Sequence, residues 1–332
     1  MTAELGSIQL MVVPGTIDAI DVDATQHLTS PRGRLSAEDL VERVPELGRV
    51  AQVRALSTGS VLSHALSDGD WIGLARTIQG ALERRGVDAV VVTHGTNNLE
   101  ETAYFLSLVL RSGKPVVITG AMRPFTALSS DGPANLLNAV RVAADRKSKD
   151  RGVVVVFSGS IYSARDVTKM STQRIEPFGS LDLGPLGFID SDGSVGYEGI
   201  SVRSLHRGAT FDLSVIERLP KVPVITSYIG ADAAIVVGCV ASGVEGIVSA
   251  GGGGGICTPI ETEALEAAVE SGIIVCQASR VWGGRVVVNA ARQASGFIAA
   301  GNLNPWKARI LLQLALTQTK DRDEIQELFD RL

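Results

Sequence analysis

The hydrophobic positions of this chain fall into short, nearly continuous Val/Ile runs that alternate with longer segments of helical periodicity. A short run that is apolar at every position predicts a strand covered on both faces, as in parallel sheets. We predict strands at residues 9–13, 89–93, 115–119, 152–157, 222–227, 246–249 and 272–276. We predict helices at residues 71–84, 99–111, 134–144 and 261–271. This alternation indicates an α/β fold built on parallel sheets with helices on both faces.

The alternation lapses once, between residues 196 and 221, where the sequence reads "GYEGISVRSLHRGATFDLSVIERLPK". A chain of 332 residues also exceeds the size at which one hydrophobic core usually keeps growing. We therefore predict a large N-terminal parallel-sheet α/β domain at residues 1–196, a linker at 197–221 and a smaller C-terminal α/β domain at 222–332. The final stretch, "NPWKARILLQLALTQTKDRDEIQELFDRL", predicts two amphipathic helices that close the second domain.

Composition and charge narrow the classes of protein that fit this pattern. The chain is 45% hydrophobic with a net charge of −5 and scattered positive residues, which argues against nucleic acid as a partner. The N-terminus "MTAELGSIQL" lacks the pattern of a secretory signal, and no apolar stretch approaches the length of a membrane span. Cys239, Cys257 and Cys276 are odd in number and lack paired spacing, which disfavours disulfides and a zinc site. We expect a cytoplasmic protein with buried thiols.

Polar residues that follow the predicted strands are the first candidates for chemistry, because ligands of open parallel sheets bind beyond the carboxyl ends of the strands. These positions offer Thr16 in "VVPGTIDAI", Ser60 in "LSTGSVL", Thr96 and Asn97 in "THGTNN", and Lys169 in "YSARDVTKMST". Several hydroxyls and one amine are the groups that nucleophilic acyl transfer needs: an alcohol to attack, an amine to take its proton and backbone amides to hold the oxyanion.

Each of these residues also has an ordinary structural interpretation. A threonine after a strand is usually a turn or cap residue, and a single lysine is usually a surface charge. His94 fits a packed imidazole bonded to backbone better than a metal ligand, since no second His or Cys lies nearby. Glu100 and Glu101 fit the first turn of a helix, where the dipole favours negative charge. The "GGGGG" run at residues 251–255 lacks the flanking residues of a phosphate loop.

Long motifs spread over nearly the whole chain have a residue order that composition alone does not explain. They include "PGTI", "THGTNNLEETAYFL", "KPVVITGAMRPFTALSSDGPANLLNAV", "ARDVTKMST" and "GNLNPWKARILLQLALTQTKD". In these motifs the chain resembles the bacterial-type L-asparaginase/glutaminase family, as a divergent member. The resemblance implies a large N-terminal and a smaller C-terminal α/β domain, and assembly into a tetramer of two intimate dimers. It also implies hydrolysis of the side-chain amide of asparagine or glutamine without a metal or cofactor.

The resemblance assigns roles to residues by their positions in these motifs. It implies that Thr16, in "VPGTI", is the nucleophile that attacks the amide carbon. Thr96 in "THGTN" and Lys169 in "DVTK" match the family's second active-site threonine and its lysine. Ala121 in "GAMRP" matches the residue whose carbonyl receives the amide nitrogen of the substrate, and Ser60 matches the residue that holds its α-carboxylate. Without the resemblance, "STGS" around Ser60 is equally typical of a turn or a helix cap.

Three family residues around the α-ammonium of the substrate are replaced here. Asn97 stands where the family has an Asp, and Val61 where it has a Gln; a Glu lent by the neighbouring subunit aligns with Ala290 or Ala291. A charged hydrogen bond contributes roughly 1.5–3 kcal/mol, and an ammonium stranded without partners costs several more. We therefore expect a substrate without a free α-ammonium. A neutral Asn97 should also lower the pKa of Lys169.

Two further departures concern loops. The family's mobile-loop tyrosine has no counterpart in "QHLT", where His27 and Thr29 are open candidates for its role and are otherwise ordinary loop residues. Residues 282–285 align with the family's intersubunit loop, where Arg285 is an unusual charge that would favour an anionic substrate. We expect a homotetramer, or at least a dimer, in which the small domain of one subunit completes the site of another.

Three functions are compatible with these residues. The first is an amidohydrolase with a threonine nucleophile, retuned to a carboxamide that lacks a free α-ammonium. The second is ordinary L-asparaginase or glutaminase activity with an unconventional subsite, and the third is a non-catalytic binding or regulatory paralogue. Thr16, Thr96 and Lys169 are all kept while the residues around the ammonium change together, which favours the first function over the third.

Overall fold

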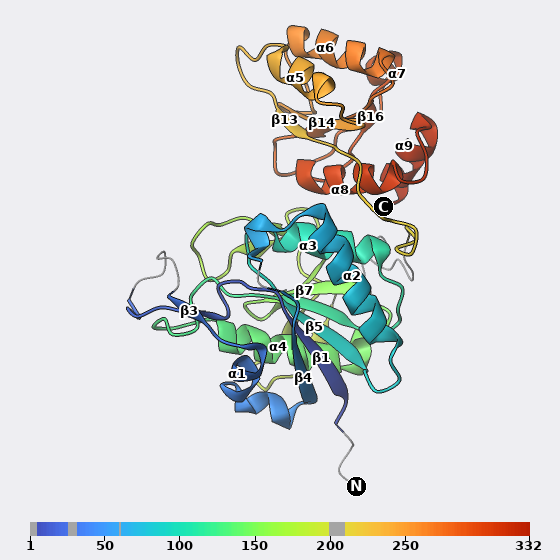
Figure 1. Ribbon diagram of the computed structural model, residues 1–332. Helices are drawn as coiled ribbons and strands as arrows, with labels where there is room; N and C mark the ends of the chain where they lie inside the picture. The colour runs from blue at the N-terminus through green and yellow to red at the C-terminus, as the bar shows by residue number, and fades with distance from the viewer. Residues whose placement is uncertain (1–4, 26–31, 60, 199–209) are drawn as a thin grey trace. The chain divides into compact units, whose positions relative to one another are not determined.

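The computed structural model describes residues 5–25, 32–59, 61–198 and 210–332. The chain divides into two compact units, Met1–Val215 and Ile216–Leu332, each with its own sheet (Figure 1). The predicted fold class is confirmed: a large parallel-sheet α/β unit precedes a smaller α/β unit. Ser60, His27 and Thr29, which sequence analysis singled out, lie outside the described residues.

The centre of the large unit is a set of parallel strands. In their order across the sheet they are β4 (Gln52–Ser57), β1 (Ser7–Val12), β5 (Ala89–Thr93), β6 (Val116–Thr119) and β7 (Val153–Phe157). Every residue of β5, β6 and β7 is buried, because helices cover both faces of the sheet. Register pairs Val12 with Thr93 and Thr93 with Thr119, so β1, β5 and β6 end at one level.

The edge strand β4 was not predicted. Its sequence, "QVRALS", carries Gln52 and Arg54, and none of its residues is fully buried. The continuous apolar pattern that marks the central strands is therefore absent from it.

Three antiparallel strands extend the sheet beyond β7, which the parallel pattern did not predict. They are β8 (Ser160–Ser163), β11 (Gly187–Ile189) and β12 (Val195–Tyr197). Ser158 and Gly159 join β7 to β8 with φ values of 49° and 78°. Two consecutive residues with positive φ form a tight hairpin turn, so the chain must return antiparallel.

Helices lie on both faces of the large sheet (Figure 1). On one face α1 (Ala37–Glu42) and α4 (Gly132–Ala144) pack into a single apolar cluster with β1, β5, β6 and β7. On the other face lie α2 (Asp68–Glu83) and α3 (Leu99–Val109), whose Trp71 and Phe105 rings stack with centroids 5.3 Å apart. Helix α2 begins three residues earlier than predicted because Ser67 and Asp70 form a capping box.

The small unit is a parallel sheet in the order β13 (Val224–Thr226), β14 (Gly246–Gly251), β15 (Ile274–Ser279) and β16 (Ile298–Ala299). Helices α5 (Ala234–Ala241) and α6 (Pro259–Glu270) share an apolar cluster on it, and α8 (Pro305–Ala315) packs on β14 and β15. The short α7 (Ala290–Ala294) and α9 (Arg322–Arg331) lie beside β16. The two C-terminal helices are thus confirmed.

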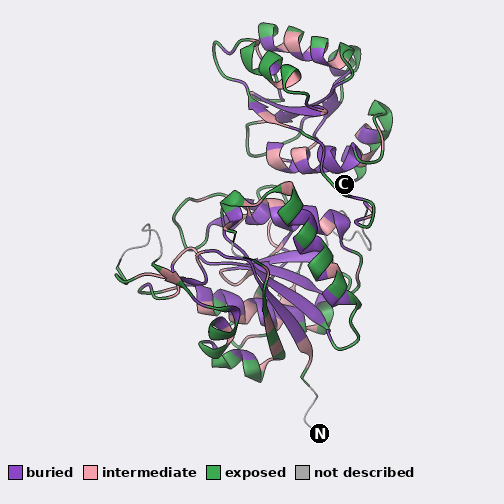
Figure 2. Ribbon diagram, viewed as in Figure 1, coloured by how far each residue is buried: buried purple, intermediate pink, exposed green. Residues whose placement is uncertain are grey.

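Short ribbons and turns complete the chain. They are β2 (Ala19–Ile20) with β3 (Gly33–Arg34), β9 (Thr168–Lys169) with β10 (Phe178–Gly179), and 3₁₀ turns at Pro45–Arg49, Ser63–Ala65 and Arg146–Ser148. Figure 2 shows the central strands of both sheets buried and the outer sides of the helices exposed. Among the residues that the structure describes, no helix is both long and apolar enough to cross a membrane.

Candidate active site

The strand order of the large sheet reverses at β1. From β1 the chain first adds β4 on one side and then places β5, β6 and β7 on the other. In such sheets the crevice beyond the carboxyl ends of the strands at this reversal is the usual ligand site. Thr16 follows β1 and Thr96 follows β5, so the two predicted threonines lie on turns at this point.

The turns that carry the two threonines are in direct backbone contact. A Cβ atom on Gly15 would lie 2.7 Å from the amide nitrogen of Gly95, and one on Gly95 would overlap Ser63 Oγ. Both glycines are therefore required by close approach rather than by φ. The contact presses the residues next to Thr16 and Thr96 against each other.

The turn at Thr16 is fixed by Asp18, which sequence analysis did not single out. The backbone N–H of Gly15 donates to Asp18 Oδ1 at 2.7 Å, and the Asp18 side chain is buried. Arg34, in β3, pairs with the same carboxylate. An Asp three residues after a glycine in "GTID" was the available signal, since Asp side chains commonly accept from nearby backbone N–H groups in turns.

Thr96 and Lys169 are joined by a hydrogen bond. Lys169 Nζ donates to Thr96 Oγ1 at 2.8 Å across 73 positions of sequence. Thr96 is buried and Lys169 half-buried in the ribbon β9–β10, where it pairs with Phe178. Burial lowers the pKa of Lys169, and the charge of Glu100 opposes that shift. The cause is desolvation, which the sequence did not reveal, and the expected effect of Asn97 on this pKa stays a prediction.

Glu100 has a different environment from the one expected of it. It does lie in the first turn of α3, but it is only 6% exposed, and its Oε2 accepts a hydrogen bond of 3.3 Å from the backbone N–H of Lys169. Consecutive helical residues point about 100° apart, so Glu100 can point into the interior while Glu101 lies nearer the surface. The sequence showed two glutamates at a helix start and gave no sign of which one faced inward.

His94 is a packed imidazole, as its ordinary interpretation predicted. It is fully buried, with Nδ1 2.8 Å from the Gly95 carbonyl and Nε2 3.1 Å from Thr102 Oγ1. Trp71 Nε1 donates to the same hydroxyl at 2.9 Å. Burial lowers the pKa of His94 to about 4, so the ring is neutral at pH 7. Through its contact with the Gly95 carbonyl, the ring stabilises the turn that carries Thr96.

The residues predicted around the substrate amide and ammonium have distinct environments. Ala121 is fully buried directly after β6, in a turn where Asp131 accepts from the N–H groups of Met122 and Arg123 at 2.9 Å. Asn97 and Val61 are exposed, and neither carries a charge.

A cavity of about 300 Å³ opens where β1 and β4 end, against α2. Its apolar lining residues are Val13, Pro14, Val61, Leu66 and Leu74, and its polar side chains are Thr58, Asp70 and Thr77. Asp70 is already engaged by the α2 capping box, where it accepts from the Ser67 N–H at 2.7 Å and the Ser67 hydroxyl at 2.5 Å. The cavity thus begins at the residues that precede Thr16, and its one carboxylate, that of Asp70, caps α2 through Oδ2.

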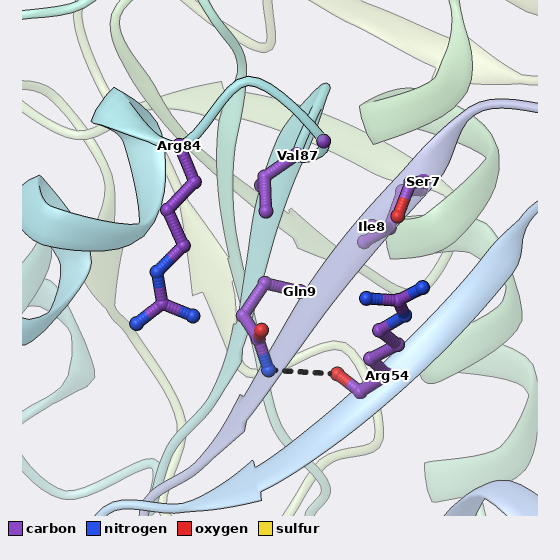
Figure 3. A pocket seen from close by; sticks show the side chains of 7 residues that line it. Ser7, Ile8, Gln9, Arg54, Arg84 and Val87 are labelled. Carbon is purple, nitrogen blue, oxygen red and sulfur yellow. Dashed lines mark hydrogen bonds between the residues drawn. The ribbon is translucent and has the colours of Figure 1, made fainter.

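A second cavity, of about 230 Å³, lies at the opposite end of the same strands. Figure 3 shows Arg84 and Arg54 on either side of Gln9, whose side-chain amide donates to the Arg54 carbonyl at 2.9 Å. It contains none of the predicted site residues. Because ligands of such sheets bind at the carboxyl ends of the strands, it is not the candidate active site.

Arg285, Ala290 and Ala291 belong to the small unit, whereas Thr16, Thr96 and Lys169 belong to the large unit. All three are exposed there. No group of three His, Cys, Asp or Glu side chains within the described ranges is arranged to hold a metal ion. Cys257 and Cys276 are buried, and burial raises the pKa of both thiols.

Comparison with known proteins agrees with this architecture. Residues 7–200 match the model of the family described as "Asparaginase, N-terminal", and residues 221–329 that of "Glutaminase/Asparaginase C-terminal domain". The chain is 40% identical over 329 residues to L-asparaginase 2 of Escherichia coli, covering 98% of this chain and 93% of that protein. It is 41% identical over 331 residues to "Probable L-asparaginase periplasmic" of Haemophilus influenzae, covering 99% of this chain and 93% of the other.

A solved structure has the same fold over nearly the whole chain. The crystal structure of "Probable Cytoplasmic L-asparaginase" from Campylobacter jejuni superposes with a TM-score of 0.94 at 37% identity, covering 98% of this chain and 100% of that one. Two family models, these relatives and this fold lead to one conclusion. The chain belongs to the asparaginase family, whose members are hydrolases of amide carbon–nitrogen bonds.

Proposed function

We propose that the protein is an amidohydrolase in which Thr16 is the nucleophile and Thr96 and Lys169 complete the catalytic centre. The observation that carries the proposal is the 2.8 Å hydrogen bond from Lys169 Nζ to Thr96 Oγ1, at the strand reversal where the turn of Thr16 packs against that of Thr96. A half-buried lysine whose pKa lies below its ordinary value is suited to accept a proton.

The proposed reaction is acyl transfer in two steps. Thr16 Oγ bonds to the amide carbon as its proton passes to a neighbouring acceptor, and backbone amides near Thr96 hold the oxyanion. The carbon–nitrogen bond then breaks, and ammonia or an amine leaves with the proton, its nitrogen having donated to the Ala121 carbonyl. Water, positioned by Thr96 and Lys169, attacks the acyl-enzyme and releases the acid and the free Thr16 hydroxyl.

The proposed substrate is a carboxamide without a free α-ammonium, such as a dicarboxylic monoamide or a more apolar amide. Asn97 and Val61 supply no charge to that part of the site, where the family resemblance expects an Asp and a Gln. An ammonium bound beside these two residues would lack the charged partner that an Asp at position 97 would supply. Ser60 and Arg285 remain the proposed contacts for an anionic end of the substrate.

The proposal extends to the assembly. Residues 1–196 would carry the catalytic threonines and lysine, 197–221 would link the domains, and 222–332 would bring Arg285 to the site of a neighbouring subunit in a homotetramer. The family-model matches, which end at 200 and resume at 221, are compatible with this division. Free thiols at Cys239, Cys257 and Cys276 support a cytoplasmic location.

A second candidate is L-asparaginase or glutaminase activity with an unconventional subsite. It is favoured by the 40% identity to an L-asparaginase over 98% of the chain. A non-catalytic binding paralogue is the third function compatible with the residues.

One experiment separates these functions: ammonia release measured over a panel containing L-asparagine, L-glutamine, succinamate, glutaramate and neutral aliphatic amides. The proposal expects a monoamide acid to have a kcat/KM at least about tenfold above that of L-asparagine, since one lost charged contact accounts for that factor. Equal or better hydrolysis of L-asparagine would establish the second candidate. Thermal stabilisation by an amide with no hydrolysis of any would establish the third.

A further inference from the structure

The two glutamates at the start of α3 make different contacts. Glu101 is half-buried and accepts from Asn98 Nδ2 at 3.0 Å, as a residue of the first helical turn commonly does. Glu100 is 6% exposed and reaches across to another part of the fold, where its Oε2 accepts from the backbone N–H of Lys169 at 3.3 Å. Glu101 therefore stabilises the start of the helix, and Glu100 binds the ribbon that carries Lys169.

Lys169 is held at both ends by the same segment. Its backbone is bound by Glu100, and its ammonium group by Thr96, four residues earlier in the chain. The ribbon β9–β10 is only two residues long on each side, so it fixes the position of Lys169 weakly by itself. The contact with Glu100 ties this short ribbon to a helix of eleven residues.

Charge adds a second effect. Burial lowers the pKa of Lys169, and the negative charge of Glu100 acts in the opposite direction. Asn97, next to Thr96, is neutral and cannot share that role. A carboxylate as buried as Glu100 needs compensation, which the N-terminal turn of α3, the N–H of Lys169 and the lysine charge supply.

We propose that Glu100 is a positioning residue of the catalytic centre, whose carboxylate fixes the backbone of Lys169 and stabilises the ammonium of that lysine beside Thr96. The inference rests on the proposed catalytic role of Lys169. It names a residue that acts through Lys169 and does not itself touch the substrate. Its consequence is that the protonation of Lys169 depends on Glu100 and not on Glu101.

The test compares E100Q with the matched variant E101Q, which removes the same charge one residue along the same helical turn. The protein is labelled with ¹³C-lysine, and the side-chain signal of Lys169, assigned by its absence from K169M, is titrated by NMR. We expect E100Q to lower the pKa of Lys169 by about one unit, a tenfold larger neutral fraction at a given pH, and E101Q to leave it within about 0.2 units. The acid limb of kcat/KM should move to lower pH by the same amount in E100Q.

E100D separates position from charge, because it keeps the carboxylate but shortens its reach to the backbone of Lys169. We expect it to lower kcat about tenfold with KM nearly unchanged, and to leave the pKa of Lys169 closer to that of the wild type than E100Q does. Should E100Q not fold, as judged by circular dichroism, the kcat of E100D compared with that of E101Q carries the test.

Identical titration of Lys169 in the wild type, E100Q and E101Q would overturn the proposal. So would an E100D enzyme with wild-type kcat. The NMR titration needs no substrate, so it decides the role of Glu100 even if no amide is hydrolysed. Failure of the proposed function and failure of this inference are therefore distinguishable.

Discussion

Arg34 donates through one nitrogen to both oxygens of Asp18, at 2.9 Å each, and to the carbonyl of Gly15 at 2.7 Å. Asp18 in turn accepts from the Gly15 N–H. Both polar groups of the residue before Thr16 are thus held by one ion pair. The ribbon β2–β3, which pairs Ala19 with Arg34, brings the two side chains together.

Removal of the guanidinium should therefore weaken the turn of Thr16. In R34M, Asp18 remains buried without its cation, and we expect a loss of about 2–3 kcal/mol in the free energy of unfolding, below the full cost of a buried pair because Arg34 is 30% exposed. The measurement is urea denaturation, with R85M, an exposed arginine on another loop, as the control. Equal losses of unfolding free energy in R34M and R85M would show that the Arg34–Asp18 ion pair does not stabilise the turn of Thr16.

Substitution of the three proposed catalytic residues should remove activity without unfolding the protein. T16A, T96V and K169M should each lower turnover of the true substrate by on the order of 10³-fold or more, because each removes a group of the reaction itself. None removes a large buried apolar side chain, so melting temperatures should stay within a few degrees of the wild type. T262V and K320M, in the other unit, are the controls. A T16A enzyme with more than about a tenth of wild-type activity would exclude Thr16 as the nucleophile.

Buried neutral His94 should make the protein sensitive to acid. Its pKa is about 4 when folded and 6.5 when exposed, so below pH 6.5 the unfolded chain binds more protons than the folded one. Stability is complete above pH 6.5 and falls as pH decreases toward 4, by about 3 kcal/mol over that window. Between pH 7.5 and 4.5, H94Q should lose less stability than the wild type. H64Q, which replaces an exposed histidine, should lose as much stability as the wild type. Urea midpoints at both pH values provide the comparison.

The sequence predicts those features of the fold and the site that depend on residues close together in the chain. The buried strand β5 and the turn after it follow from "AVVVTHGTNN" alone, since the run is apolar at every position. The edge strand β4 lacked that signal because only its alternate residues Val53 and Ala55 pack against the core, while the residues between them face solvent. The contact between Lys169 and Thr96 spans 73 positions, and no periodicity encodes it; their positions after strands made both residues candidates, and only the family resemblance gave both of them roles. The inward direction of Glu100 depends on how α3 docks, which the sequence does not show.

Assembly is a prediction of the proposed site. If the small domain of one subunit completes the site of another, light scattering at micromolar concentration should give the mass of a tetramer or a dimer, and a monomeric mass would contradict the proposal. Arg285 is exposed in its own unit, so its substitution should not disturb the fold. R285A should raise KM for an anionic amide about tenfold, as the loss of one charged hydrogen bond implies. Unchanged kinetics in R285A would remove the arginine from the site.

The last prediction concerns the two neutral residues at the proposed ammonium subsite. N97D restores a carboxylate beside Thr96, and V61Q adds an amide where Val61 now lines the cavity. Each charged contact with an ammonium is worth roughly 1.5–3 kcal/mol, so the double variant should raise kcat/KM for L-asparagine by at least about tenfold relative to the preferred monoamide acid. The comparison within one enzyme cancels any general effect of the substitutions on catalysis. N97D alone also places a second carboxylate near Lys169, which should raise the pKa of the lysine and move the acid limb of kcat/KM to higher pH. A double variant whose preference between the two substrates equals that of the wild type would show that Asn97 and Val61 do not select against an ammonium.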